Sequence, residues 1–170
     1  MIRVVVDDIA FVNADAVVRP ATTRLEPTTA ALRHLEQVGG LSFSRQIQVQ
    51  QDLAVGAAVV TGGGDLPVPF VIHAIIKGAT EPVTAATVRR SLISSLQRAE
   101  DWQLSNLSLP LLGTGAGALP VEEAAEILCD VLGTHMGQGA FPTDVQIVVD
   151  KAEEQQLVEA MLRRRGLALT

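Results

Sequence analysis

The chain has 170 residues, of which 48% are hydrophobic, and a formal net charge of −6. This length and apolar content are typical of a single folded domain with a buried core, and they exclude a disordered chain. Acidic residues outnumber basic residues by 19 to 13, so the chain lacks the positive charge typical of a duplex-binding protein. Four Phe and one Trp are too few for the aromatic platform of a single-strand binder. We therefore expect one domain over residues 1–170 and no nucleic-acid partner.

Cysteine, histidine and hydropathy patterns exclude further classes of protein. The single cysteine, Cys129, provides neither a disulfide framework nor a thiolate metal cluster, and we expect it to be a small buried side chain of a helix. The three histidines lack the spacing of zinc ligands. No apolar run approaches the ~18 residues of a membrane span, and the N-terminal residues lack a signal-peptide cleavage site. We expect a cytoplasmic protein without a metal, a redox cofactor or a membrane association.

The first fifty residues contain patterns for two strands and a helix. Short apolar, β-branched runs predict buried strands at residues 2–6 and 16–18. A helix is predicted to open at Pro27-Thr28-Thr29 and to end at Gly39-Gly40. The polar segment 42–51, with alternating apolar residues near its end, is compatible with either a strand or a loop.

From residue 57 onward, strand and helix patterns alternate. The helix patterns repeat apolar residues at 3.6-residue spacing, and the strand patterns are short apolar runs. In order they are a run at 57–61 that enters a turn at 62–67, a strand at 70–76, a helix at 84–102, a strand at 107–112, a helix at 121–136, a strand at 144–149 and a helix at 153–165. This alternation predicts an α/β fold.

The glycine-rich loop after residue 112 is the strongest local signal for a ligand site. It joins a strand to a helix that begins near Pro120, so backbone N–H groups and the positive end of the helix dipole meet there. Such a turn suits a phosphate and needs no Lys or Arg. Gly113, Gly115 and Ala118 match the spacing of a dinucleotide-binding turn, but no acidic residue follows at the end of a strand about 20 residues on. The alternative interpretation is a tight turn that lets helix and strand pack closely.

A second candidate site lies at the end of the first strand. Asp7 and Asp8 follow this strand, and α/β proteins bind ligands at the carboxyl edge of the sheet. A carboxylate there can accept a hydrogen bond from an exocyclic amine such as that of adenine. The alternative is a solvated carboxylate that ends a strand. His73, inside an apolar run, is expected to be a hydrogen-bonded core residue rather than a base. No nucleophile–base arrangement is found, so we assign no catalytic residue.

Together, several segments resemble a macro domain, the ADP-ribose-binding module. They occur in the family's order and spacing, and they cover nearly the whole chain. They are Asp8-Ile9, residues 15–18 (DAVV), residues 56–67 (GAAVVTGGGDLP), residues 70–73 (FVIH) and residues 109–120 (LPLLGTGAGALP). The resemblance implies a three-layer α/β/α sandwich with a central mixed β-sheet. It also implies ADP-ribose or a related adenine nucleotide as the ligand, and allows an ADP-ribosylated protein as a partner.

The resemblance also implies roles for particular residues. Asp8 would accept a hydrogen bond from the exocyclic amine of adenine, and the backbone of Ile9 would contact the ring. Thr22 stands where the family's Asn reaches the distal ribose. The loop that would cradle the diphosphate and the distal ribose consists of Gly113, Thr114, Gly115, Ala116, Gly117 and Ala118.

Two segments depart from the family's pattern. The N-A-A-N motif reads Arg19-Pro20-Ala21-Thr22 here, so one short hydroxyl stands in place of the last amide. The family's glycine run reads Pro27-Thr28-Thr29-Ala30-Ala31, in which β-branched residues resist the backbone conformations of glycine and Pro27 has no N–H. We therefore expect a domain that binds ADP-ribose with little or no hydrolysis.

Two other functions remain open on the sequence alone. One is an enzyme that removes ADP-ribose from protein or the acetyl group from O-acetyl-ADP-ribose. The other is a degenerate macro fold that binds a protein partner or a different anion, with Arg19, Arg24 and Arg33 near the altered loop.

Overall fold

A six-stranded mixed sheet organises the structure. The computed structural model describes residues 1–50, 53–115, 118–167 and 169. The strands are β1 (Ile2–Val6), β2 (Ala16–Thr22), β3 (Ala58–Gly62), β4 (Phe70–Lys77), β5 (Asn106–Leu109) and β6 (Asp144–Val149). They lie in the order β1-β6-β5-β2-β4-β3, in which β3 is antiparallel to β4 and the other neighbours are parallel. The carboxyl ends of five strands therefore meet at one edge.

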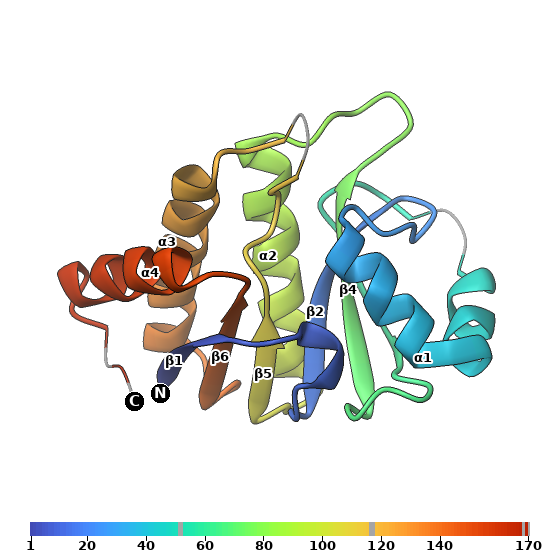
Figure 1. The fold of residues 1–170 in the computed structure, drawn as a ribbon, viewed down its shortest axis with the longest axis horizontal. Coiled ribbons are helices and arrows are strands. Elements are labelled where there is room, and N and C mark those ends of the chain that lie inside the picture. Colours follow the sequence, from blue (N-terminus) through green and yellow to red (C-terminus); the bar gives the residue numbers. More distant parts are fainter. Residues whose placement is uncertain (51–52, 116–117, 168, 170) are drawn as a thin grey trace.

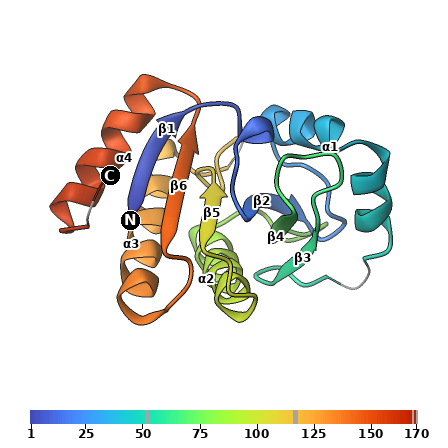
Figure 2. The same ribbon diagram turned by 90° about the horizontal axis from the view of Figure 1, so that it is seen from below.

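Helices cover both faces of this sheet. They are α1 (Ala30–Gln48), α2 (Ala85–Asp101), α3 (Val121–Gln138) and α4 (Ala152–Arg164), with a short 3₁₀ helix η1 (Ile9–Phe11) after β1. Figure 1 shows α3 and α4 beside β1 and β6, whereas α1 lies at the opposite end of the sheet. In Figure 2, α1 and η1 lie on one side of the strands, and α2 and α3 lie on the other. The predicted three-layer α/β/α sandwich is confirmed. Among the described residues, no helix has the length and apolar content that crossing a membrane requires.

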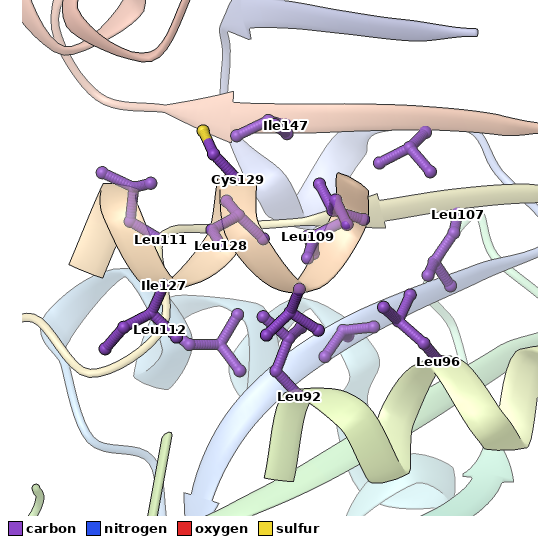
Figure 3. Packing of buried hydrophobic residues seen from close by; sticks show 14 of the residues in the cluster. Leu92, Leu96, Leu107, Leu109, Leu111, Leu112, Ile127, Leu128, Cys129 and Ile147 are labelled. Carbon is purple, nitrogen blue, oxygen red and sulfur yellow. The ribbon is translucent and has the colours of Figure 1, made fainter. Parts of the chain in front are cut away.

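The larger core lies between the sheet and the helices α2, α3 and α4 (Figure 3). Cys129 of α3 is fully buried in it, as the sequence predicts, and burial raises the pKa of its thiol to about 11. Leu92 and Leu96 of α2 face strand residues of β5 across this core. Each such leucine stabilises the fold by about 1.5–3 kcal/mol through removal of apolar surface from water. A smaller cluster packs η1 and α1 against the other face.

A first helical segment of α1 ends at Gly39-Gly40 as predicted, and a second, unpredicted helical segment follows it directly across a kink. Gly40 has a φ of +72°, which kinks the helix, and Ser44 Oγ then donates to the Gly40 carbonyl at 3.2 Å. Phe43 is fully buried beyond the kink, and its burial favours helix over solvated loop. The segment 42–51 is therefore neither strand nor loop but helix as far as Gln48, while Gln51 lies outside the described residues.

The observed strands differ from the predictions mainly at two ends. β2 continues from the predicted run to Thr22, because its later residues pair with β4. β5 ends at Leu109 rather than at residue 112, because Pro110 has no N–H to extend the ladder. These two differences shape the site.

Candidate functional site

The cavity at the carboxyl edge opens where β2 and β5 stop pairing. The ladder between these strands covers Ala16 and Val17, whereas β2 itself continues to Thr22. Pro20 in β2 and Pro110 after β5 lack the N–H groups that would extend this ladder. Both prolines line a cavity of about 640 Å³. The space lies beyond the strand ends, at the position where open α/β sheets bind ligands.

Four segments form the rest of the cavity wall. Residues 7–9 follow β1, and Asp150 follows β6. The first turn of α1 contributes residues 29–32, and its next turn contributes His34. The glycine-rich loop after β5 contributes Thr114. The structure therefore brings together both of the segments that the sequence singles out, and adds the start of α1.

Asp8 is held in position by a backbone donor. Its Oδ1 accepts from the Ala10 N–H at 2.9 Å, which caps η1. The Asp8 N–H in turn donates to Asp7 Oδ1 at 2.7 Å. Ile9 is buried and lines the cavity immediately after Asp8. Because a carboxylate has further acceptor sites on both oxygens, Asp8 can still accept from a ligand.

Among the described residues of the glycine-rich loop, Thr114 lines the cavity, whereas Gly113, Gly115 and Ala118 do not. Gly113 and Gly115 have φ values of +91° and +130°, which side chains with a Cβ rarely adopt. The Leu119 N–H donates to the Gly113 carbonyl at 2.9 Å, and the Ala118 N–H donates to that of Gly115 at 3.2 Å. A Cβ on Gly115 would stand 3.6 Å from the Thr28 carbonyl oxygen, so this loop runs alongside the first loop, which is residues 23–29 between β2 and α1. The predicted site residues Ala116 and Gly117 lie outside the described residues.

The start of α1 presents backbone N–H groups to the cavity. Thr29 caps the helix by accepting from the Leu32 N–H at 3.4 Å. Ala30 and Ala31 belong to the first turn, whose N–H groups have no partners within the helix, and both residues line the cavity. Thr28 Oγ1 is buried without a hydrogen-bond partner among the described residues. Amides and a helix dipole of this kind form an anion site.

Thr22 has a different environment from the one its position in the family's motif implies. Its Oγ1 accepts from the N–H groups of Arg24 and Glu26, at 3.2 Å each, and so stabilises the turn after β2. It is not among the described residues that line the cavity. The described residue of β2 that lines the cavity is Pro20.

Arg19 is buried inside the protein and cannot recognise an anion in the cavity. It is fully buried, and its guanidinium donates to His73 Nδ1 at 2.8 Å, to Glu36 Oε1 at 2.8 Å and to the Leu25 carbonyl at 2.6 Å. The guanidinium carbon also lies 5.7 Å from the centre of the Phe43 ring, in the range of a cation–π contact. Arg24 and Arg33 are exposed and do not line the cavity either. The three arginines that the sequence suggested as a site for a different anion are thus absent from the described cavity wall.

His73 is a buried core residue, as the sequence predicts. Since Arg19 Nε donates to its Nδ1, the ring proton sits on Nε2 and is donated to Thr61 Oγ1 at 2.8 Å. The Thr61 hydroxyl then donates to the Gly62 carbonyl at 3.1 Å. Burial, followed by the charge of Arg19, holds the pKa of His73 well below its usual range. The ring therefore stays neutral.

The neutral state of His73 predicts a loss of stability in mild acid. Below the ordinary His pKa of about 6.5, the unfolded chain binds a proton that the folded chain excludes. The contribution of His73 to the free energy of unfolding is therefore fully present above a pH of about 6.5. It decreases as the pH is lowered further, by up to about 1.4 kcal/mol per pH unit. Urea unfolding at pH 7.5, 6.5 and 5.5 measures the slope. His73→Gln, though less stable throughout, is expected to have a flatter slope, and an equal slope would contradict this assignment.

Charge is distributed unequally along the cavity. Asp7 and Asp8 follow β1, whereas Asp150 and Glu154 follow the adjacent β6, so the carboxylates lie toward the β1 edge of the sheet. The wall nearer β5 and β2 consists of neutral residues and helix amides, and the described lining contains no Lys or Arg. Among the described residues, no group of three or more His, Cys, Asp or Glu is arranged to hold a metal ion.

Comparison with known proteins identifies the family. The family model for the macro domain matches residues 18–128, which is more than half of the chain. A relative from Enterobacter sp., named O-acetyl-ADP-ribose deacetylase, is 30% identical, and the alignment covers 98% of this chain and 96% of that protein. The chain belongs to the macro domain family.

Two further comparisons concern longer relatives and solved structures. An uncharacterized protein of Mycobacterium tuberculosis is 27% identical over 75% of this chain. The match spans 36% of that protein, so the chain covers about a third of this longer relative. The macrodomain of Oceanobacillus iheyensis, solved with ADP, superposes with a TM-score of 0.84 at 20% identity and covers 95% of this chain and 89% of that one. This likeness establishes the shared fold.

Among the cavity residues that sequence reasoning missed, His34 is the one that contacts a predicted site residue. Its Nε2 lies 3.1 Å from Asp8 Oδ2, although 26 positions separate the two residues along the chain. Spacing between the three histidines could not reveal this contact, because its partner is a carboxylate on another element. A usable signal is the position of His34 five residues after the helix cap Thr29, on the second turn of the helix whose start the sequence predicts.

Proposed function

We propose that this chain binds ADP-ribose or a related adenine nucleotide in the cavity at the carboxyl edge. The observation that carries the proposal is the shared cavity: Asp8, the glycine-rich loop and the amide-lined start of α1 open on one space of about 640 Å³. A volume of this size is within the range of small-molecule sites. The ADP bound in the Oceanobacillus iheyensis macrodomain supports the same ligand class.

The charge distribution supports one orientation of the ligand. Phosphates avoid the carboxylates near β1 and β6, and they are stabilised by the dipole and the N–H groups at the start of α1. The base then lies beside Asp8, which accepts from its exocyclic amine, with Ile9 next to the ring. Gly113, Thr114 and Gly115 lie on the phosphate side. In this proposal Thr22 supports the first loop from behind rather than contacting the ribose.

We propose little or no hydrolysis. The position of the family's first motif amide is occupied by Arg19, whose donors all point into the protein interior. In the described lining near β5 and β2, where the distal ribose would lie, no carboxylate or imidazole is available as an acid or base. The Enterobacter relative named as a deacetylase favours a second candidate function, removal of the acetyl group from O-acetyl-ADP-ribose.

Calorimetric titration with ADP-ribose, followed by incubation with O-acetyl-ADP-ribose, tests both functions. We expect saturable binding of ADP-ribose and no release of acetate above the uncatalysed rate. Ribose 5-phosphate, which lacks the base, should bind far more weakly. Absence of heat with millimolar ADP-ribose would contradict the binding function, whereas catalytic turnover would establish the deacetylase.

Replacement of Gly115 by Val is expected to weaken nucleotide binding. The φ of +130° strains any residue with a Cβ, so the loop must change its backbone conformation at the phosphate side of the cavity. We expect the Kd for ADP-ribose to rise about tenfold or more, which corresponds to about 1.4 kcal/mol. Gly166→Val is the matched control, because Gly166 has a φ of +71° but lies far along the chain from the cavity, after α4. Gly166→Val should lower the free energy of unfolding without raising the Kd for ADP-ribose. An equal rise of the Kd in both variants would contradict a role of the glycine-rich loop in binding.

A further inference from the structure

His34 and Asp8 form a pair on the base side of the cavity. His34 lies on the second turn of α1, Asp8 lies after β1, and both line the cavity. The His34 Nε2 and Asp8 Oδ2 atoms are 3.1 Å apart, and the two side chains are 46% and 43% exposed. The pair is therefore accessible from the cavity rather than sealed in the core.

The donor and acceptor roles within this pair follow from the chemistry of the carboxylate. An ionised carboxylate can only accept, so Nε2 of His34 has the proton and donates it to Oδ2. Oδ1 of the same carboxylate accepts from the Ala10 N–H at 2.9 Å. Each oxygen of Asp8 is thus held by one protein donor, and the two donors come from different elements. This arrangement fixes the rotation of the carboxylate and leaves acceptor sites for a ligand.

The imidazole itself is held by a neighbouring ring. Phe11 of η1 meets His34 edge to face, with ring centres 5.9 Å apart and an interplanar angle of 64°. Such a contact favours one ring orientation. Consequently the direction of the Nε2–H bond toward Asp8 is set by both the helix and the aromatic contact.

We infer that His34 is a positioning residue that makes this cavity select a 6-aminopurine over a 6-oxopurine. The inference rests on the proposed function and deepens it. Adenine presents an N–H donor at position 6 and an acceptor at N1, whereas hypoxanthine presents an acceptor at position 6 and a donor at N1. A carboxylate that is free to turn can move from the position of the adenine amine to accept from the N1–H of hypoxanthine. A carboxylate held at both oxygens cannot, so it faces the carbonyl oxygen of hypoxanthine and rejects it.

Titration with two ligands tests this inference. ADP-ribose and inosine diphosphate ribose differ at the 6-position, and both are titrated into the unchanged chain, His34→Phe and His34→Gln. We expect the unchanged chain to prefer ADP-ribose by about tenfold or more, the value of one well-placed hydrogen bond. His34→Phe keeps a ring against Phe11 but removes the donor, and its preference should fall to about threefold or less. His34→Gln can place an amide N–H near the Nε2 position and should restore most of the preference.

The outcomes separate this inference from the function on which it rests. If the unchanged chain binds both ligands equally, or if His34→Phe weakens both ligands by the same factor, the inference is overturned while nucleotide binding stands. If the unchanged chain does not bind ADP-ribose at all, both are overturned. Thermal unfolding of each variant without ligand shows whether it is folded, and because the readout is a ratio of two affinities, a uniform loss of folded protein does not change it.

Discussion

Asp8→Asn is expected to raise the Kd for ADP-ribose by tenfold or more while leaving the fold unchanged. Asn retains an oxygen that can cap η1 in place of Asp8 Oδ1, so the backbone after β1 keeps its conformation. The variant loses the charge that strengthens a hydrogen bond from the adenine amine, and it gains an NH₂ group that opposes that amine. A tenfold change corresponds to about 1.4 kcal/mol, which is within the range of a hydrogen bond to a charged group.

A second carboxylate of the same cavity provides the control for this result. Asp150 lines the cavity after β6 and is exposed, so Asp150→Asn removes the same charge from the same space without removing the acceptor for the base. Calorimetry should show the Asp150→Asn affinity within about threefold of the unchanged chain. Equal losses in both variants would indicate that net charge, rather than a bond to Asp8, governs binding.

Arg19→Met is expected to produce the largest loss of stability among the variants considered, about 3 kcal/mol or more. The change leaves Glu36, the Leu25 carbonyl and His73 Nδ1 without their common donor in a buried region. Breaking a buried ion pair by removal of one partner costs about 3–5 kcal/mol, and the partial exposure of Glu36 places this site near the lower end. Urea unfolding at pH 7.5 measures the effect.

The control for Arg19 is an arginine on the surface of the same region. Arg33→Met lies on the exposed side of α1, and the expected change is within about 0.5 kcal/mol. A loss below about 1 kcal/mol in Arg19→Met would show that water or the remaining side chains replace its bonds. The comparison therefore isolates the buried network from the general effect of removing a positive charge.

Most of the fold could be predicted from local patterns, because those patterns report burial. Apolar runs identified β1 and β6 at their observed bounds, and 3.6-residue periodicity identified α2 to within a residue at each end. The helical segment after the stop at Gly40 was missed because its amphipathic pattern is weak. Its helical state depends on tertiary burial of Phe43, which a local pattern does not contain.

The parts of the candidate site that lie directly after strands could be predicted from the sequence. The parts that depend on contacts between side chains distant in the sequence could not. Asp8 and the glycine-rich loop could be found because each directly follows a strand. The direction of the Arg19 side chain could not, since an arginine at a position that the family resemblance places beside the ligand suggests a surface charge. Its burial follows from partners contributed by β4, α1 and the first loop together. The roles of the predicted ligand-binding residues stay predictions.

The bond from Arg19 to the Leu25 carbonyl has a consequence for the entropy of ligand binding. Leu25 is buried and has a φ of +59°, so the first loop is held in an unusual backbone conformation by contacts internal to the protein. A glycine-rich loop loses conformational freedom when it closes around a diphosphate, whereas a loop already held from the core loses little. In the proposed complex, Pro27, Thr28 and Thr29 in place of the family's glycines thus offer fewer hydrogen bonds to phosphate but also lower the ordering cost. Preorganisation of this kind offsets some of the lost enthalpy, so a weaker set of contacts can still yield a measurable affinity.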